Sequence, residues 1–418
     1  MAITRRQVIV GGLAAGAVAS LPLVGRRARA RTPCKLVMVL NYGGWDTTYS
    51  IDPKPGLPLI DVAEGTERRF GNIPIWSHPS RPNVDRFFER WAPRTTMVHG
   101  VQVRSFVHTD CIKRVLTGSP SETAPDLGAM AAFELAPDLP VPYLALGSQA
   151  RSGPLASITG RAGTSNQLVA LVDPEAAYAQ PGGLIPDQGL IPTGQEQDLV
   201  AAFIAAGTAR LRATRGQRGY NKRRIDDFAQ SIERADRLAR FVRDGASLGA
   251  RDYTPQLEVQ IPLAVQALRD GLSQAALLQS SYSWDTHSGN NQQSMFHDGL
   301  FGSLDTLCAE LESADLLDQT LVVVMSEMGR TPKLNGQQGK DHWPVTSCFM
   351  LGASVPGDRV LGGTNDELGA RSVDLETGEL DSAGTQLQAA NLAAGILSTV
   401  GVDASGYLPG TSALTLTP

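Results

Sequence analysis

Acidic and histidine side chains recur in this sequence within the turns that directly follow short apolar runs. A carboxylate can hold a cation or exchange a proton, and a neutral imidazole is a common metal ligand. If the apolar runs are parallel strands of one sheet, their carboxyl ends meet at one edge, where ligands bind in open α/β sheets. Carboxylates gathered there would repel one another unless a cation lay between them. The sequence therefore predicts a divalent metal site formed by Asp46, Asp285, His287, Glu327, Asp341 and His342.

These residue types do not identify the metal, because mixed carboxylates and imidazoles suit zinc, manganese or iron and, less well, magnesium or calcium. Each residue also has a purely structural explanation. Asp46 could cap the turn after its glycine pair, and residues 285–287 could be a satisfied loop network. Glu327 could pair with Arg330, and His342 could be a packed histidine. Their shared position after predicted strands favours a joint site over separate explanations.

A second group of reactive side chains lies in the segment 106–118. His108 could be a metal ligand, a general acid or base, or a core residue. Thr109 and Cys111 are candidate nucleophiles, and a cysteine in that role requires a positioned base. Arg330 could steady a developing oxyanion. The predicted catalytic residues are therefore His108, Thr109 and Arg330.

The segments that must position these residues alternate between strand and helix patterns. This alternation indicates an α/β layered domain with the candidate residues at strand ends. Strands are expected over residues 35–40, 96–103, 141–146, 275–282, 320–325 and 346–351. Helices are expected over residues 83–91, 124–135, 257–272, 295–311 and 387–400.

The segment of about 100 residues between 150 and 250 interrupts this alternation. Residues 150–194 are rich in Gly, Pro, Ser and Ala, and we expect them to be irregular. Helical patterns over 199–211 and 223–243 follow. We therefore predict an irregular and helical insertion within the domain.

The N-terminus carries the features of a twin-arginine export signal over residues 1–30. Arg5 and Arg6 precede the uncharged run Val8–Val24, which is short and weakly apolar for a membrane span, and Ala28-x-Ala30 is a plausible cleavage signature. An uncleaved anchor is the alternative. Cleavage predicts export in the folded state by the twin-arginine translocase, a periplasmic or secreted location, and no membrane span in residues 31–418.

Composition narrows the class of protein further. The chain has 418 residues and a formal net charge of −5, which gives no basic patch for nucleic acid or anionic lipid. About 388 residues after the signal suggest one large domain, or one domain with an inserted lobe. The four cysteines form no CxxC pair, so a zinc knuckle is not expected and buried free thiols are.

Several motifs resemble those of a known family. WDTHS at 284–288, SEMGRTP at 326–332, NG at 335–336 and GKDHWP at 339–344 resemble the signature of the DUF1501 family of exported bacterial proteins. The resemblance covers essentially the whole of residues 31–418. It implies the alkaline phosphatase-like, or sulfatase-like, superfamily and hence a three-layer α/β/α sandwich with a mostly parallel central sheet and a helical insertion.

Two positions depart from what the superfamily implies. Its ligand order would place Met328 where a histidine or asparagine stands, and a thioether is a poor ligand for hard cations. The nucleophile position of sulfatases falls on His108 rather than on Cys111, and the Cys-x-Pro-x-Arg motif is absent, so a formylglycine sulfatase is not expected. Either His108 replaces the nucleophile, Thr109 takes its role, or water activated by the metal attacks.

We therefore expect a metal-dependent hydrolase of phosphate, sulfate or related esters, with a small molecule or a polysaccharide as its substrate. The alternative is a non-catalytic envelope binding protein on a degenerate hydrolase scaffold, which the departures at Met328 and His108 favour. A third interpretation keeps the metal but assigns isomerase or transferase chemistry. Fold alone does not decide among these functions.

Overall fold

The computed structural model describes the chain at residues 34–161, 194–219, 221, 222, 225, 226, 229 and 256–417 except 354. The predicted export signal, most of the irregular segment and most of the helix predicted over 223–243 lie outside these residues. The helix predicted over 199–211 is present within α6 (Gly194–Thr214). Among the described residues, no helix combines the length and the apolar character needed to cross a membrane.

An eight-stranded sheet lies at the centre of the domain, and all of its strands but one run in the same direction. The exception is β11, which is antiparallel to both β4 and β8. In spatial order the strands are β12 (Arg359–Gly362), β4 (Thr95–Gln102), β11 (Val345–Gly352), β8 (Thr320–Met325), β1 (Lys35–Leu40), β7 (Ala275–Gln279), β5 (Tyr143–Ala145) and β6 (Thr159–Arg161). The central strands are buried on both faces, which explains their nearly continuous apolar sequences.

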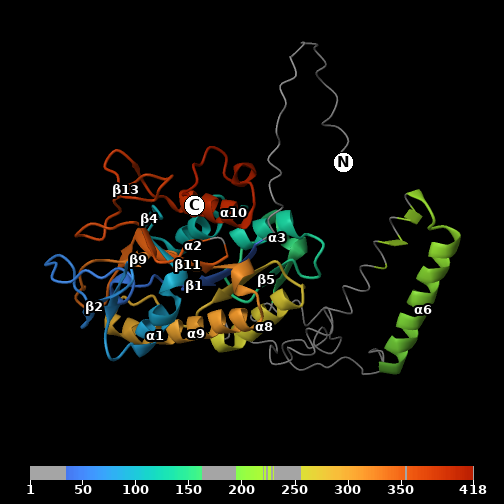
Figure 1. Ribbon diagram of the computed structural model, residues 1–418, viewed down its shortest axis with the longest axis horizontal. Coiled ribbons are helices and arrows are strands. Elements are labelled where there is room, and N and C mark those ends of the chain that lie inside the picture. Colours follow the sequence, from blue (N-terminus) through green and yellow to red (C-terminus); the bar gives the residue numbers. More distant parts are fainter. Residues whose placement is uncertain are drawn as a thin grey trace, which may run out of the picture. The chain divides into compact units, whose positions relative to one another are not determined.

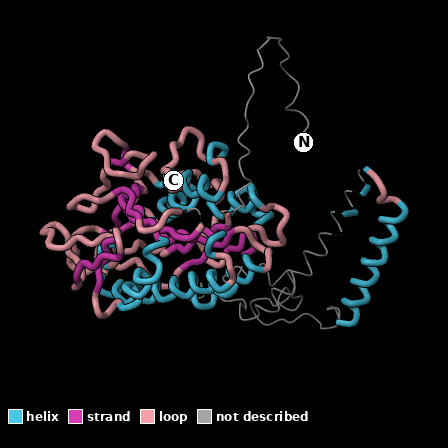
Figure 2. Tube along the Cα trace, viewed as in Figure 1, coloured by secondary structure: helices cyan, strands magenta, loops and turns pink. Residues whose placement is uncertain are grey.

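Helices cover both faces of this sheet, so the domain has three layers (Figure 1). One face packs against α1 (Pro82–Trp91), α8 (Leu257–Arg269) and α9 (Gln293–Ser313). The other packs against α2 (His108–Thr117), α3 (Leu127–Leu135) and α10 (Ala389–Val400). Figure 2 shows the strands in magenta between the two groups of helices. The predicted three-layer α/β class with a mostly parallel sheet is confirmed.

In the part of the chain that the structure describes, three two-stranded sheets lie outside the central one. β2 (Thr66–Phe70) and β3 (Ile73–Ser77) form a hairpin, and β13 (Ser372–Val373) pairs with β14 (Thr385–Gln386). β9 (Gly329–Arg330) pairs with β10 (His342–Trp343), which closes the polar loop between them. That pairing matters for the site, because it fixes His342 opposite Arg330.

The sequence predicted the position of every central strand except β6 and β12, with ends that differ by up to three residues. It did not predict α2, which begins at His108 and ends at Thr117. All four cysteines are buried, and Cys111, Cys308 and Cys348 are free thiols.

Candidate metal centre

The turn after β1 approaches the loop after β7 closely enough to require glycine. Gly43 has a φ of 123°, and a Cβ added there would lie 2.6 Å from the backbone nitrogen of Asp285. Gly44 has a φ of 86°, and its Cβ would meet the side chain of Met328 at 2.9 Å. The glycine pair therefore brings together the loops that follow three neighbouring strands, β1, β7 and β8.

Asp285 lies at the centre of a cluster of imidazoles. Its Oδ2 lies 3.4 Å from Nε2 of His108, and its Oδ1 lies 3.2 Å from Nε2 of both His287 and His342. One ligand atom from each of His108, Asp285 and His342 lies within 4.8 Å of the other two, a spacing that could hold a metal ion. His287 adjoins this group, with its Nε2 3.0 Å from Nε2 of His342.

Each imidazole uses its other ring nitrogen to contact an acceptor. Nδ1 of His108 lies 2.7 Å from Oε1 of Glu327, and Nδ1 of His287 lies 2.8 Å from Oδ1 of Asp341. Nδ1 of His342 lies 2.6 Å from the carbonyl oxygen of Phe106. A carbonyl oxygen or an ionised carboxylate can only accept, so Nδ1 is the donor in such a contact, and a neutral ring then carries its lone pair on Nε2.

That assignment leaves three Nε2 lone pairs directed at one carboxylate. The buried Nε2 of His108 has no hydrogen-bond partner in the described part of the chain. Lone pairs facing a carboxylate are unfavourable unless protons or a cation lie between them. Histidines that bind metals typically donate the second ring N–H to a carboxylate or a carbonyl, as all three do here. The donor set therefore fits a divalent cation.

Glu327 is fully buried and positions His108 rather than contacting the cluster itself. Its carboxylate accepts the backbone N–H of Gly43 at 2.9 Å and the hydroxyl of Ser326 at 3.1 Å. Asp341 is half exposed and holds His287 in the same way, with Asn335 donating to the same oxygen at 3.2 Å. Two of the predicted ligands thus lie behind the imidazoles that they orient.

Asp46, also predicted as a ligand, is brought to a different place. Its Oδ2 lies 2.7 Å from the ammonium nitrogen of Lys340, and both side chains are about 1 % exposed. Thr48 and Asn290 donate to its two oxygens at 2.6 and 2.9 Å. Burial opposes ionisation of Asp46, but Lys340 and these donors outweigh it and lower the pKa. The lysine thus supplies the positive charge that the sequence assigned to a metal.

Arg330 is buried, and most of its donors are already in use. Nε donates to the carbonyl of Gly44 at 2.8 Å and Nη1 to that of Lys340 at 2.9 Å. Nη2 contacts the carbonyls of Gly43 and Trp284 and lies 2.5 Å from Oδ1 of Asp285. Arg330 therefore holds the surrounding loops and Asp285 in place. Its three nitrogens already contact protein oxygens, so it does not offer two free N–H groups to an oxyanion.

Neighbouring charges and hydrogen bonds shift the pKa values of Asp285 and His108. Burial alone would raise the pKa of Asp285, but the hydrogen bond and charge of Arg330 lower it to about 2. The hydrogen bond to Glu327 raises the pKa of His108 above its usual value, against the opposing effect of burial. Asp285 is therefore a carboxylate at any ordinary pH.

The candidate nucleophiles lie on the first turn of α2. Thr109 is exposed next to His108, and no hydrogen bond of its hydroxyl appears within the described residues. Cys111 is buried, and burial raises the pKa of its thiol to about 12, which disfavours the reactive thiolate. His297 contacts the carbonyl of Asp46 at 3.1 Å. His99 is buried beside Ser347.

Sequence reasoning missed two groups that shape this site. The first is Lys340, which directly precedes Asp341 and His342 and pairs with Asp46. A buried carboxylate requires a partner of opposite charge, so the burial of Asp46 would have indicated such a lysine. The second is the carbonyl of Phe106, which orients His342. Every residue has a backbone carbonyl, so the residue type gives no indication of this contact.

A family model described as "Protein of unknown function (DUF1501)" matches residues 34–408. A comparison with curated proteins finds no match. The chain is similar in fold to several solved structures at low identity. One is a protein in the alkaline phosphatase superfamily from Vibrio parahaemolyticus, with a TM-score of 0.40 and 13% identity over 91% of this chain and 69% of that one.

Two further solved structures come from other bacteria. The C-terminal periplasmic domain of EcEptC from Escherichia coli, in complex with Zn, has a TM-score of 0.42 and 11% identity over 93% of this chain and 87% of that one. The lipoteichoic acid synthase LtaP from Listeria monocytogenes has a TM-score of 0.39 and 9% identity over 92% of this chain and 74% of that one. At these identities the likeness concerns the fold alone.

Proposed function

The chain belongs to the DUF1501 family of proteins of unknown function, and we propose that it is a metal-dependent hydrolase of phosphate, sulfate or related esters. The observation that carries this proposal is the convergence of three Nε2 atoms on Asp285 while every Nδ1 contacts an acceptor. This arrangement has the donor atoms, the tautomers and the supporting carboxylates of a metal site.

The residues divide into those that hold the cation and those that hold the ligands. His108, Asp285 and His342 would be the ligands, with His287 as an adjacent fourth donor. Glu327 and Asp341 would fix the imidazoles, and Arg330 would fix Asp285. When bound, a divalent cation supplies Lewis acidity toward an ester oxygen and toward water. Zinc suits three imidazoles and one carboxylate well.

The attacking group is either water or the hydroxyl of Thr109. Thr109 is exposed and follows His108 on the first turn of α2, so its hydroxyl is accessible from solvent. No side-chain base contacts Thr109 among the described residues, which favours water. A Thr109→Val variant distinguishes the two routes, because turnover survives only if water attacks.

The export signal predicted over residues 1–30 places this activity in the periplasm or outside the cell. Export of the folded chain by the twin-arginine translocase would let the metal enter in the cytoplasm, before the chain meets competing ions. The physiological substrate on this view is a small-molecule or polysaccharide ester of the envelope or its surroundings.

The test is elemental analysis of the purified full-length protein together with turnover of p-nitrophenyl phosphate, bis(p-nitrophenyl) phosphate and p-nitrophenyl sulfate. We expect bound divalent metal, hydrolysis of at least one ester, and loss of both in His342→Ala. The matched control is His78→Ala, since His78 contacts Ser80 near the start of α1, away from the cluster. A wild-type protein that binds no metal would overturn the proposal.

A non-catalytic binding protein is the second candidate function. The observation that favours it is the Lys340–Asp46 pair, which removes one predicted ligand and leaves a single cation position in the described residues. Such a protein would retain metal but hydrolyse none of the three esters. Ester turnover that disappears in His342→Ala would exclude it.

A further inference from the structure

A tyrosine of unassigned role, Tyr42, lies in the turn after β1. Its two neighbours in the chain are fixed to the end of β8 and to the loop that follows. The backbone N–H of Asn41 donates to the carbonyl of Met325 at 2.8 Å. The backbone N–H of Gly43 donates to the carboxylate of Glu327 at 2.9 Å. The backbone of Tyr42 is therefore held by contacts that also position Glu327.

The ring of Tyr42 lies beside the metal cluster. Its centroid is 5.4 Å from that of His108, and the two rings are inclined at 58°. Tyr42 also packs against the buried side chains between the sheet and α2, α3 and α10. Burial raises the pKa of Tyr42, and the negative charges of Glu327 and Asp285 raise it further. The phenol group is thus close enough to both carboxylates to respond to their charges.

The hydroxyl of Tyr42 makes no hydrogen bond to any described residue, and its side chain is partly exposed. Two other tyrosines show the opposite arrangement. Tyr143 donates to Asp126 and Tyr407 donates to Glu134, each at 2.7 Å. A partly exposed phenol that the protein does not engage can donate to a bound ligand.

An ester bound at the cluster requires donors in addition to the cation. A transferring phosphoryl group spreads its charge over three equatorial oxygens, and one cation does not contact all three. Arg330 does not supply these donors, because its nitrogens already contact protein oxygens. Tyr42 contacts the proposed ligand His108 and has a hydroxyl available. It is therefore placed to supply a hydrogen bond that Arg330 cannot.

We propose that Tyr42 is a substrate-binding residue whose phenolic hydroxyl donates to a non-bridging oxygen of the ester held at the cation. This inference rests on the proposed function, because it takes the ester to the cluster of His108, Asp285 and His342. A neutral donor stabilises charge on the ester oxygen without adding another ionised group to the site. The phenol is also a more acidic donor than the aliphatic hydroxyl of Thr109.

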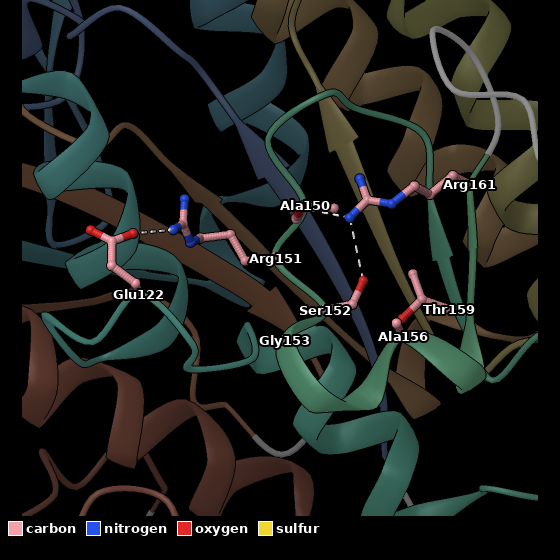
Figure 3. A pocket seen from close by; sticks show the side chains of 8 residues that line it. All are labelled: Glu122, Ala150, Arg151, Ser152, Gly153, Ala156, Thr159 and Arg161. Carbon is pink, nitrogen blue, oxygen red and sulfur yellow. Dashed lines mark hydrogen bonds and ion pairs between the residues drawn. The ribbon is translucent and has the colours of Figure 1, made fainter.

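A different place for an anion would be the polar cavity of about 330 Å³ beside β6 (Figure 3). Its arginines are engaged by protein oxygens, as the dashed lines in Figure 3 show. Arg151 is paired with Glu122 at 3.1 Å, and Arg161 donates to the carbonyl of Ala150 at 2.9 Å. This cavity supplies a control position for the test, because Arg151 does not contact the metal cluster in the described structure.

The test compares the zinc-loaded full-length wild type with Tyr42→Phe, which keeps the ring that packs against His108. The substrates are the p-nitrophenyl and phenyl esters of the acid, phosphoric or sulfuric, whose esters the wild type hydrolyses. The value of kcat/KM should fall by about tenfold to a hundredfold for both esters, with zinc affinity and the free energy of unfolding unchanged. Tyr407→Phe is the matched control and should retain kcat/KM, because its hydroxyl bonds to Glu134 instead.

Equal kcat/KM in Tyr42→Phe and the wild type overturns the inference, while the proposed hydrolase stands. A loss confined to the phenyl ester, which has the poorer leaving group, would assign Tyr42 to the leaving oxygen and overturn the contact with the non-bridging oxygen.

Binding of inorganic phosphate and inorganic sulfate decides the role of Tyr42 if the zinc-loaded protein hydrolyses no ester. Calorimetric titration then compares the wild type with Tyr42→Phe and Arg151→Gln. Tyr42→Phe should weaken the tighter-binding anion about tenfold, and Arg151→Gln should leave its affinity unchanged. Weakening by Arg151→Gln alone would place the anion in the cavity of Figure 3 and overturn the inference. Binding of neither anion also overturns it, and a protein that binds no metal overturns both proposals.

Discussion

Asp46 and Asp285 occupy equivalent places in the sequence and opposite environments in the protein. Each acid follows a buried strand, β1 or β7, and the two strands are hydrogen-bonded neighbours. Asp46 is fully buried and ion-paired with Lys340, with further donors on both oxygens. Asp285 is 41 % exposed and surrounded by the Nε2 atoms of three histidines.

This difference teaches that a carboxylate at a strand end can serve as a metal ligand only if it keeps an oxygen that no lysine or arginine holds. Arg330 contacts Oδ1 of Asp285, and Oδ2 faces Nε2 of His108. The Asp46 region is a closed network, in which charge and hydrogen bonds are satisfied internally. The Asp285 region is open, because its nitrogen lone pairs require something that the chain does not supply. The two regions should therefore respond in opposite ways to substitution.

The largest effect is expected on the open side. Asp285→Asn removes the only carboxylate among the converging ligand atoms, so metal affinity and ester turnover should fall by more than about a hundredfold. The free energy of unfolding of the metal-free protein should also fall, because the buried Arg330 loses its carboxylate partner. Metal titration and denaturant unfolding measure the two effects. Unchanged metal affinity would show that Asp285 is not a ligand.

On the closed side, removing the cation should affect stability instead. Lys340→Met leaves Asp46 as an unpaired buried charge, and we expect a loss of about 3–5 kcal/mol in the free energy of unfolding. The double variant Asp46→Asn with Lys340→Met should recover most of that loss, since neither charge remains. Urea unfolding of the three metal-free proteins provides the measurement. A single variant as stable as the wild type would mean that Asp46 is neutralised in another way.

The free energy of unfolding should also depend on pH through His297, which contacts the carbonyl of Asp46 in the closed network. Burial lowers the pKa of His297 to about 3, so the folded chain holds it neutral while the unfolded chain protonates it below its usual value. The unfolded state then binds more protons between about pH 6.5 and pH 3, and stability falls as pH falls through that window. Between neutral pH and pH 5 this group should account for about 2 kcal/mol.

A His297→Gln variant checks this assignment. Its free energy of unfolding should lose that part of the pH dependence, while its metal affinity at neutral pH should match the wild type. A pH profile identical to that of the wild type would assign the acid sensitivity to other groups.

The smallest effect is expected where an exposed acid supports the open side. Asp341→Asn weakens the hold on His287 and should lower metal affinity by about tenfold, the lower end of what supporting residues contribute. Glu327→Gln, at the buried carboxylate behind His108, serves as the stronger comparison. If Asp341→Asn proved the more damaging of the two, His287 rather than His108 would be the principal imidazole ligand.

Much of the framework followed from the sequence. Apolar runs such as Thr320–Met325 predicted buried strands, because a strand covered on both faces has few polar positions. Glycines and acids directly after these apolar runs predicted the loops at the carboxyl ends of the strands. The motifs at 284–288 and 339–344 identified the family that the match over residues 34–408 confirms. His108, Asp285, His287 and His342 were all named as candidates for the site.

What the sequence did not determine was the role of each acid, because a carboxylate's role depends on which charge faces it. Asp46, Glu327 and Asp341 are, like Asp285, carboxylates in loops that follow strands, yet Asp46 contacts a lysine and the other two contact Nδ1 of an imidazole. Residue order fixed the elements and the reactive groups at their ends. Only tertiary packing decided which charges were paired internally, because the partners are separated by as many as 294 positions along the chain, as for Asp46 and Lys340 (340 − 46).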